Sequence, residues 1–135
     1  MSQRLTLAPG VRAALIAHAE RELPREAVGL LAGTDRCATM VCQLTNLAGD
    51  HAFLADPRTQ YEAERRIARH GLSLLAIYHS HPAGSATMSE LDVRFSRRRD
   101  VLHVVIALAR PWHEGAELRA YALEAGHPTE LPLEG

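Results

Sequence analysis

The chain has 135 residues, of which 47% are hydrophobic, and a formal net charge of -1 at pH 7. This length predicts one domain over residues 1–135 that buries about two thirds of its unfolded surface, enough for a core without disulfide bonds. The near-neutral charge argues against nucleic-acid binding through bulk electrostatics, and an apolar run long enough to cross a membrane and a secretory signal are both absent. We therefore expect a cytoplasmic protein.

The first third of the chain predicts a strand, a helix and a pair of strands. Pro9 is suited to the start of a helix, and the apolar positions that follow give this helix a partly buried face before the chain turns at Leu23-Pro24. Thr34-Asp35-Arg36 is a plausible turn between two apolar runs, which we expect to pair. The strands expected here cover residues 4–7, 26–33 and 39–44.

The rest of the chain predicts a second helix and three more strands. Asp56-Pro57 begins the helix, which covers residues 58–70 and ends at Gly71. The apolar run 72–78 (LSLLAIY) follows as a strand that leads into His79-Ser80-His81. The last two expected strands cover residues 102–109 and 118–123. The fold class is therefore α/β, with a mixed sheet flanked by helices.

A group of potential metal ligands begins where that strand ends. Side chains two apart on a strand point to the same face, so His79 and His81 converge on one point. Pro82 cannot donate a hydrogen bond to a ladder and ends the strand, and a short loop of small residues follows. Ser89 is a good helix N-cap with Asp92 three residues on, so both lie on the first turn of a helix. The loop can thus carry Asp92 back towards the histidines.

Each part of this pattern also has a simpler interpretation. Ser89 and Asp92 alone fit a capping arrangement that needs no metal. A lone His-x-His pair at a strand end usually faces solvent. The conjunction of both parts favours a metal site, and two histidines with one aspartate give the three protein ligands of catalytic zinc, whereas structural zinc usually has four. A fourth position would then hold water, whose pKa zinc lowers from about 15.7 towards about 7.

Residues 22–33 (ELPREAVGLLAG) together with the motif at 79–92 closely resemble the JAMM (JAB/MPN) metalloprotease family. The common pattern is a glutamate on an early strand followed by H-S-H-P-x6-S-x2-D, and the likeness covers nearly the whole chain. The resemblance implies the MPN/JAB fold, a sandwich similar to cytidine deaminases. It further implies that His79, His81 and Asp92 bind one zinc ion, that Glu26 is the general base, and that Ser89 helps to stabilise the oxyanion.

Glu26 is also reasonable on physical grounds. It precedes the apolar stretch 27–32, so its carboxylate at the mouth of a buried strand would face the metal with a raised pKa suited to proton transfer. An ordinary strand-edge glutamate would look the same in sequence. The residues alone do not separate Glu26 from Glu22, and the choice between them rests on the resemblance.

The resemblance also implies a substrate class. It points to the peptide or isopeptide bond after the Gly-Gly tail of a ubiquitin-like β-grasp protein, and in short bacterial members to sulfur-carrier proteins that release a C-terminal adduct such as cysteine. A glycine tail can lie extended against a sheet edge and reach a metal that bulky residues cannot approach. Two alternatives are a RadC-like, DNA-repair-associated JAB protein and a non-catalytic MPN scaffold. Scaffold relatives usually lose metal ligands.

Three further features of the chain, an arginine run, two cysteines and a loop, are not assigned to the catalytic site. Arg97-Arg98-Arg99 suits the solvated C-terminus of the helix begun at Ser89, with a docking patch for an acidic partner as the alternative. Cys37 and Cys42 would face opposite sides of a strand and could not easily pair, so we expect two buried, reduced thiols. Loop 45–56 is compatible with ordering on substrate binding, and an oligomer is equally compatible with this sequence.

Overall fold

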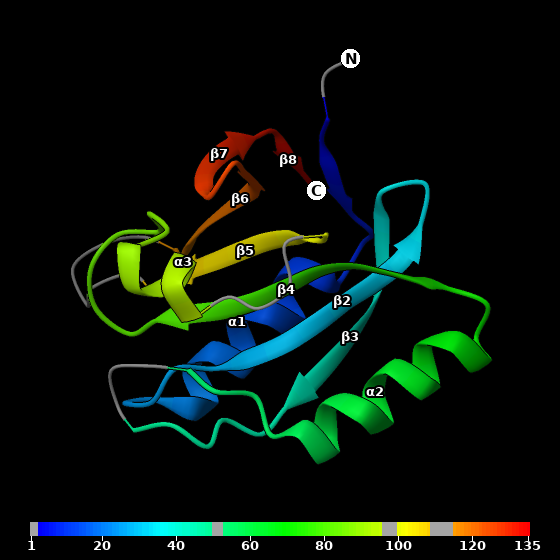
Figure 1. Cartoon of the computed structure of the whole chain (residues 1–135), viewed down its shortest axis with the longest axis horizontal. Coiled ribbons are helices and arrows are strands. Elements are labelled where there is room, and N and C mark those ends of the chain that lie inside the picture. Colours follow the sequence, from blue (N-terminus) through cyan, green and yellow to red (C-terminus); the bar gives the residue numbers. More distant parts are fainter. Residues whose placement is uncertain (1–2, 50–52, 96–99, 109–114) are drawn as a thin grey trace.

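A computed structural model describes residues 3–49, 53–95, 100–108 and 115–135 of the chain. The helices and strands are β1 (Leu5–Leu7), α1 (Val11–Glu22), β2 (Val28–Thr34), β3 (Cys37–Leu44), α2 (Pro57–Arg69), β4 (Ser73–His81), α3 (Glu90–Phe95), β5 (Leu102–Ala107), β6 (Glu117–Glu124), β7 (His127–Leu131) and β8 (Leu133–Glu134). The strands join in one mixed sheet in the order β7-β6-β5-β4-β2-β3-β1-β8 (Figure 1). The expected α/β class is confirmed.

The centre of the sheet is formed by three antiparallel strands and one parallel neighbour. β2 pairs antiparallel with β3 and β4, and β4 pairs parallel with β5. Asp35 and Arg36 make the two-residue turn between β2 and β3 with φ of 51° and 60°. Positive φ at both central residues is what a type I′ hairpin turn requires. The predicted turn is confirmed, and it fixes the register of the hairpin.

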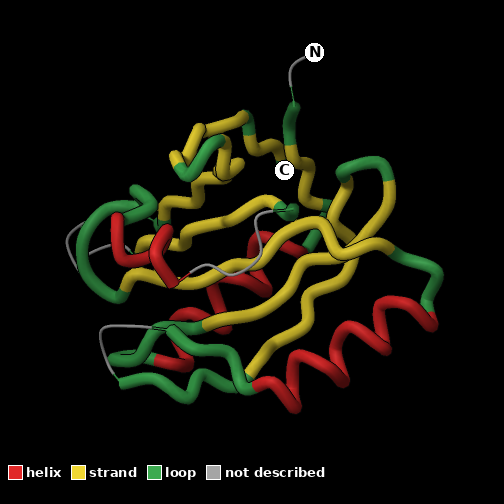
Figure 2. The backbone as a smooth tube through the Cα atoms, viewed as in Figure 1, coloured by secondary structure: helices red, strands yellow, loops and turns green. Residues whose placement is uncertain are grey.

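The two long helices cover opposite faces of the sheet. Successive strand residues point to opposite faces, so Leu31 packs in the cluster that contains α1, while Leu30 packs in the cluster that contains Ala63 and Ile67 of α2. Asp56 caps α2 by accepting a hydrogen bond from the backbone N–H of Arg58, as its sequence predicts. Figure 2 shows the helices in red on either side of the yellow strands. Among the described helices, none is long and apolar enough to span a membrane.

Two strands that the sequence did not predict join the two ends of the sheet. β7 pairs with β6 and β8 pairs with β1, so these consecutive segments bridge the outer strands (Figure 1). Only Leu131 of β7 is buried, and Pro128 lies within the strand. A short, exposed strand that contains proline shows neither hydrophobic alternation nor strong β propensity. Sequence patterns therefore gave no signal for it.

Smaller differences separate the expected elements from those observed. The strand expected at residues 26–33 begins only at Val28, which leaves Glu26 just outside it. β4 extends to His81, and Pro82 follows it as expected. Both thiols are free, as expected. Cys42 is buried, as expected, whereas Cys37 is half-buried, so the expectation of a buried thiol was wrong there. The arginines at 97–99, residues 50–52 of loop 45–56 and the end of the strand expected at 102–109 lie outside the described residues.

A buried tyrosine and histidine connect β4 to α1. Nδ1 of His18 lies 2.6 Å from the Tyr78 hydroxyl, and the two rings meet edge to face. Burial lowers the pKa of His18, and burial raises the pKa of Tyr78 well above its ordinary value. Gly29 leaves room for this tyrosine, because a Cβ there would lie 2.3 Å from the ring. The pair is thus held neutral in the core beneath α1.

The buried state of His18 predicts a loss of stability in mild acid. As the pH falls through about 6.5, the unfolded chain binds a proton that folded His18 resists, so the free energy of unfolding falls. The limit for one group is about 1.4 kcal/mol per pH unit. Urea unfolding at pH 7.5 and 5.5 should show a smaller decrease for His18→Asn than for wild type. An equal decrease in both proteins would contradict the prediction.

Candidate metal centre

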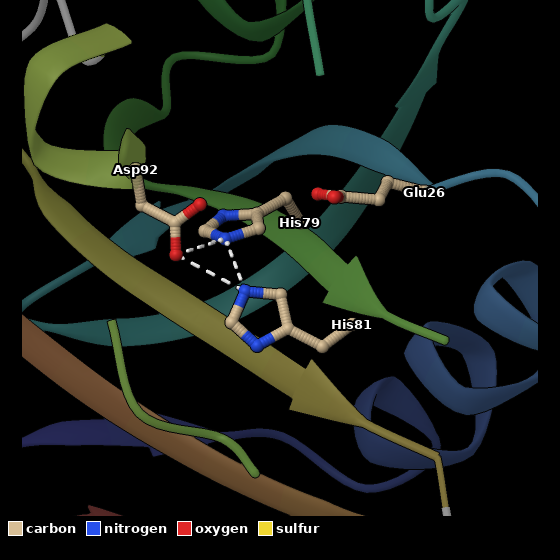
Figure 3. A group of neighbouring side chains, drawn as sticks. All are labelled: Glu26, His79, His81 and Asp92. Atoms are coloured by element: carbon tan, nitrogen blue, oxygen red, sulfur yellow. Dashed lines mark hydrogen bonds and ion pairs between the residues drawn. The ribbon is translucent and has the colours of Figure 1, made fainter. Parts of the chain in front are cut away.

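Four side chains meet where β4 ends. Glu26, His79, His81 and Asp92 each offer one ligand atom, and these atoms all lie within 4.8 Å of one another. Figure 3 shows the two imidazoles and the two carboxylates turned towards a common point. They come from three segments: the residue pair before β2, the end of β4, and the first turn of α3. The structure therefore brings together the three residues expected as ligands and the expected base.

The register of β2 against β4 explains how Glu26 reaches this point. Val28 lies opposite His79 in the antiparallel pair, so the residues that precede β2 run beside the end of β4. Ser80 extends this pairing, because its backbone N–H donates to the carbonyl of Ala27 and its Oγ accepts from the N–H of Ala27 at 2.7 Å. Ser80 is fully buried on the opposite face from the histidines. The middle residue of the H-S-H motif thus anchors the segment that carries Glu26.

Three of the ligand atoms form a nearly equilateral triangle. Nε2 of His79 lies 3.3 Å from Nε2 of His81. Oδ2 of Asp92 lies 3.1 Å from Nε2 of His79 and 3.0 Å from Nε2 of His81. His79 and Asp92 are buried and His81 is partly exposed, so the group is open to solvent from one side.

The contacts of the imidazoles favour a lone pair on Nε2 of His81. Nδ1 of His81 lies 2.8 Å from the carbonyl oxygen of Ser85. Because a carbonyl only accepts hydrogen bonds, Nδ1 carries a proton. In the neutral ring the lone pair is therefore on Nε2, and in the protonated ring Nε2 donates to Asp92. Nδ1 of His79 is buried and has no hydrogen-bond partner among the described residues. The His79 ring instead stacks on Phe53, with ring centroids 4.3 Å apart.

Burial and mutual hydrogen bonds set the protonation of this triangle. Burial lowers the pKa of His79. Burial would also lower the pKa of His81, but its hydrogen bonds with Asp92 and the Ser85 carbonyl outweigh burial and raise that pKa. Burial would raise the pKa of Asp92, but hydrogen bonds from both histidines hold it well below its usual range. The aspartate is therefore ionised, and a cation is the partner that best suits it.

Glu26 is a buried carboxyl group beside this triangle. It is 7% exposed, and its Oε1 has no hydrogen-bond partner within the described part of the chain. Burial raises the pKa of Glu26 to about 7, although nearby His81 opposes this shift and Asp92 adds to it. A carboxyl group with this pKa can accept and release a proton near neutral pH.

Ser89 and Asp92 form a reciprocal cap at the start of α3. The N–H of Asp92 donates to Oγ of Ser89 at 3.0 Å, and the N–H of Ser89 donates to Oδ2 of Asp92 at 2.8 Å. The capping and metal interpretations are therefore compatible, since one carboxylate oxygen makes both sets of contacts. Ser89 is exposed, and its Oγ acts as the acceptor in this cap, so the bond does not use the hydroxyl proton.

Asn46 and Phe53 are contacts of this site that sequence reasoning missed. Nδ2 of Asn46 donates to the carbonyl of Glu26, and its Oδ1 accepts from the N–H groups of Ala48 and Leu54. The described parts of loop 45–56 are therefore attached to the segment that carries Glu26, and they place Phe53 against His79. A single asparagine and a single phenylalanine in a loop carry no spacing signal, so the sequence could not single them out.

Comparison with known sequences agrees with this arrangement. Residues 8–124 match the family described as prokaryotic homologs of the JAB domain. A CysO-cysteine peptidase of Mycobacterium tuberculosis is 33% identical over 124 residues, which cover 89% of this chain and 83% of that protein. A probable TtuB-protein conjugate cleaving protease of Thermus thermophilus is 47% identical over 85 residues, or 62% of this chain. That match spans 57% of the Thermus protein.

Solved structures show the same fold. A protein from Desulfitobacterium hafniense superposes with a TM-score of 0.85 at 30% identity, covering 96% of this chain and 90% of its own. A JAB1/MPN domain protein from Archaeoglobus fulgidus has a TM-score of 0.62 at 21% identity, covering 97% and 100%, and supports the fold alone. The expected MPN/JAB fold is confirmed. With a family match over most of its length, the chain belongs to the prokaryotic homologs of the JAB domain.

Proposed function

We propose that this chain is a zinc-dependent peptidase of the JAMM type that cleaves after the C-terminal Gly-Gly of a ubiquitin-like sulfur-carrier protein. The observation that carries the proposal is the triangle of His79, His81 and Asp92 with the carboxyl group of Glu26 beside it, whose Oε1 has no hydrogen-bond partner among the described residues. Two relatives support the reaction class, since one is named as a protease that cleaves protein conjugates and the other as a peptidase that acts on a cysteine adduct.

The donor set fits zinc. Zinc binds nitrogen and oxygen ligands in tetrahedral geometry at about 2.0–2.1 Å, which places neighbouring ligand atoms about 3.3 Å apart. The three donor atoms of this chain lie 3.0 to 3.3 Å apart. Imidazole and carboxylate are both zinc ligands, and three protein ligands leave one position for water or substrate. His79, His81 and Asp92 would therefore hold one zinc ion per chain.

The residues around the metal supply the rest of the chemistry. A bound zinc ion would acidify a water molecule and polarise the scissile carbonyl. Glu26 would take the proton from that water and pass it to the leaving amine, a task for which a pKa of about 7 is well matched. Ser89 would donate its hydroxyl proton to the developing oxyanion of the substrate. Phe53, stacked on His79, would exclude water from one side of the site.

The site lies beside the partly exposed end of β4, and this position suits a glycine tail. His81 is half-buried and the neighbouring Asp92 and Glu26 are buried, so the reacting bond must approach closely to reach them. A segment without side chains can do this in extended conformation. The scaffold alternative is not favoured, because scaffold relatives usually lose ligands that this chain retains. The RadC-like alternative is not favoured either, because the relatives found are named as proteases or peptidases.

Metal content gives the first test. We expect about one zinc per purified chain, and loss of this zinc in His81→Ala, because two protein ligands do not complete a zinc site. Elemental mass spectrometry measures the ratio. His70→Ala is the matched control, since His70 is an exposed histidine at the end of α2 and its loss should leave the zinc in place. Equal zinc in wild type and His81→Ala would contradict the proposed ligands.

The role of Glu26 gives a second test. Glu26→Gln should keep its zinc but hydrolyse a β-grasp protein with a C-terminal extension at least about 100-fold more slowly, because the amide cannot accept the proton. Intact-mass spectrometry follows the shortened product. Glu22→Gln is the control and should react at the wild-type rate. Turnover by Glu26→Gln at the wild-type rate would remove Glu26 from the mechanism.

The same substitution should stabilise the metal-free protein. At pH 8 the Glu26 carboxylate is ionised and buried, with a folded-state pKa of about 7 against 4.5 in the unfolded chain. A raised carboxyl pKa means that ionisation destabilises the fold, so the neutral amide should increase the free energy of unfolding by roughly 1 to 3 kcal/mol. Urea unfolding in the presence of a chelator measures this difference. A less stable Glu26→Gln variant would show that the carboxylate has a partner.

A further inference from the structure

We infer that Tyr121 of β6 is a positioning residue of the metal centre: its hydroxyl holds the loop whose carbonyl orients His81. This inference rests on the proposed function, since it concerns the same site. Tyr121 lies 40 residues after His81 in the sequence and does not belong to the four-residue cluster. Its connection to the site passes through two consecutive peptide groups of the loop between β4 and α3.

The first of these is the peptide group between Ser85 and Ala86. The Ser85 carbonyl accepts the Nδ1 proton of His81 at 2.8 Å. The N–H of the same peptide group, on Ala86, lies 3.4 Å from Oε1 of Glu117 on β6. Because a peptide group is planar, any contact that fixes its N–H also fixes the direction of its carbonyl. The orientation of His81 therefore depends on how this loop is held.

The second peptide group carries the stronger attachment. The Tyr121 hydroxyl donates to the carbonyl of Ala86 at 2.9 Å, and the bond is buried. The bond from Ala86 to Glu117 is longer, and the Glu117 carboxylate is half-exposed and also pairs with Arg119. A buried hydrogen bond at 2.9 Å contributes more than a partly buried one at 3.4 Å. Tyr121, and not Glu117, is therefore the main anchor.

The surroundings of Tyr121 keep its ring in place. Tyr121 is 5% exposed, and it packs in a small apolar cluster with Met88 and Val105. Ala86 is fully buried in the same cluster, so its carbonyl cannot turn to solvent if the hydroxyl is removed. Residues 82–89 belong to no strand or helix, and side-chain contacts must therefore fix their path. Loss of the hydroxyl leaves a buried unpaired carbonyl, which favours displacement of the loop.

The expected effect falls on metal affinity. Hydrogen-bond partners of metal-binding histidines typically change metal affinity by about 10- to 100-fold when they are removed. The Ser85 carbonyl is such a partner, and Tyr121 acts one peptide group beyond it. We therefore expect Tyr121→Phe to weaken zinc binding by about tenfold, the lower end of that range.

Tyr78→Phe is the matched control. Tyr78 is also a buried tyrosine on a strand of the sheet, and its hydroxyl also has a buried hydrogen bond, to His18. Its ring packs in the cluster on the α1 face, away from the metal centre. Competition with a chromophoric chelator measures the zinc dissociation constant, and thermal unfolding measures stability. Both variants should unfold at lower temperature, but only Tyr121→Phe should bind zinc more weakly.

A second measurement reports the tautomer of His81 directly. In metal-free protein, at a pH where the ring is neutral, nitrogen-15 NMR of the imidazole should report the proton on Nδ1 in wild type and in Tyr78→Phe. Tyr121→Phe should shift these resonances towards a mixture of tautomers. Wild-type resonances together with wild-type zinc affinity in Tyr121→Phe would overturn the inference, as would equal weakening in both variants. Failure of the proposed function would appear differently, as wild-type protein that binds no zinc.

Discussion

The antiparallel register that sets Val28 opposite His79 is the constraint on which the site depends. It places the segment before β2 beside the end of β4, and Ser80 locks this segment through two hydrogen bonds with Ala27. Glu26 then lies next to the imidazoles although more than 50 residues separate them in the sequence. A shift of one residue would turn the histidines to the face covered by α1, because the side-chain period of a strand is two. The catalytic chemistry proposed for this chain thus depends on this backbone pairing as well as on the side chains that it brings together.

A second feature of the site is a buried carboxyl group whose ionisation destabilises the folded protein. No described residue donates a hydrogen bond to Oε1 of Glu26, and burial raises the pKa of this carboxyl group to about 7. Asp92 has the opposite environment, since two histidines and the N–H of Ser89 hold its charge. Two carboxyl groups within 4.8 Å of each other are therefore given very different pKa values, which is a common way for proteins to separate an acid–base group from a ligand. The buried Glu26 carboxylate thus lowers the stability of the fold at the position where the proposed reaction uses a general base.

Local patterns were sufficient to predict the elements that hold the proposed metal ligands. The period of two in β4 and the cap at Ser89 depend on neighbouring residues only, and both were found. Tertiary features were not predictable in this way. The contacts of Asn46 and Phe53 depend on loop packing, and β7 is too short and polar to have a pattern. The choice of Glu26 over Glu22 needed a family resemblance because no local property distinguishes two glutamates on either side of a turn.

The bridging of the sheet ends by β7 and β8 has a consequence for the order of folding. The partners of β1 are β3, about 30 residues away, and β8, about 130 residues away, where Leu5 pairs with Leu133. Contacts between such distant residues form late, because the intervening chain must lose conformational entropy before these contacts can stabilise the fold. During synthesis on the ribosome, β1 therefore has one open side until almost the whole chain has emerged. The central hairpin and the proposed metal ligands can assemble earlier. The unpaired edge of β1 is therefore the part of the sheet at which a growing chain can pair with wrong partners for the longest time.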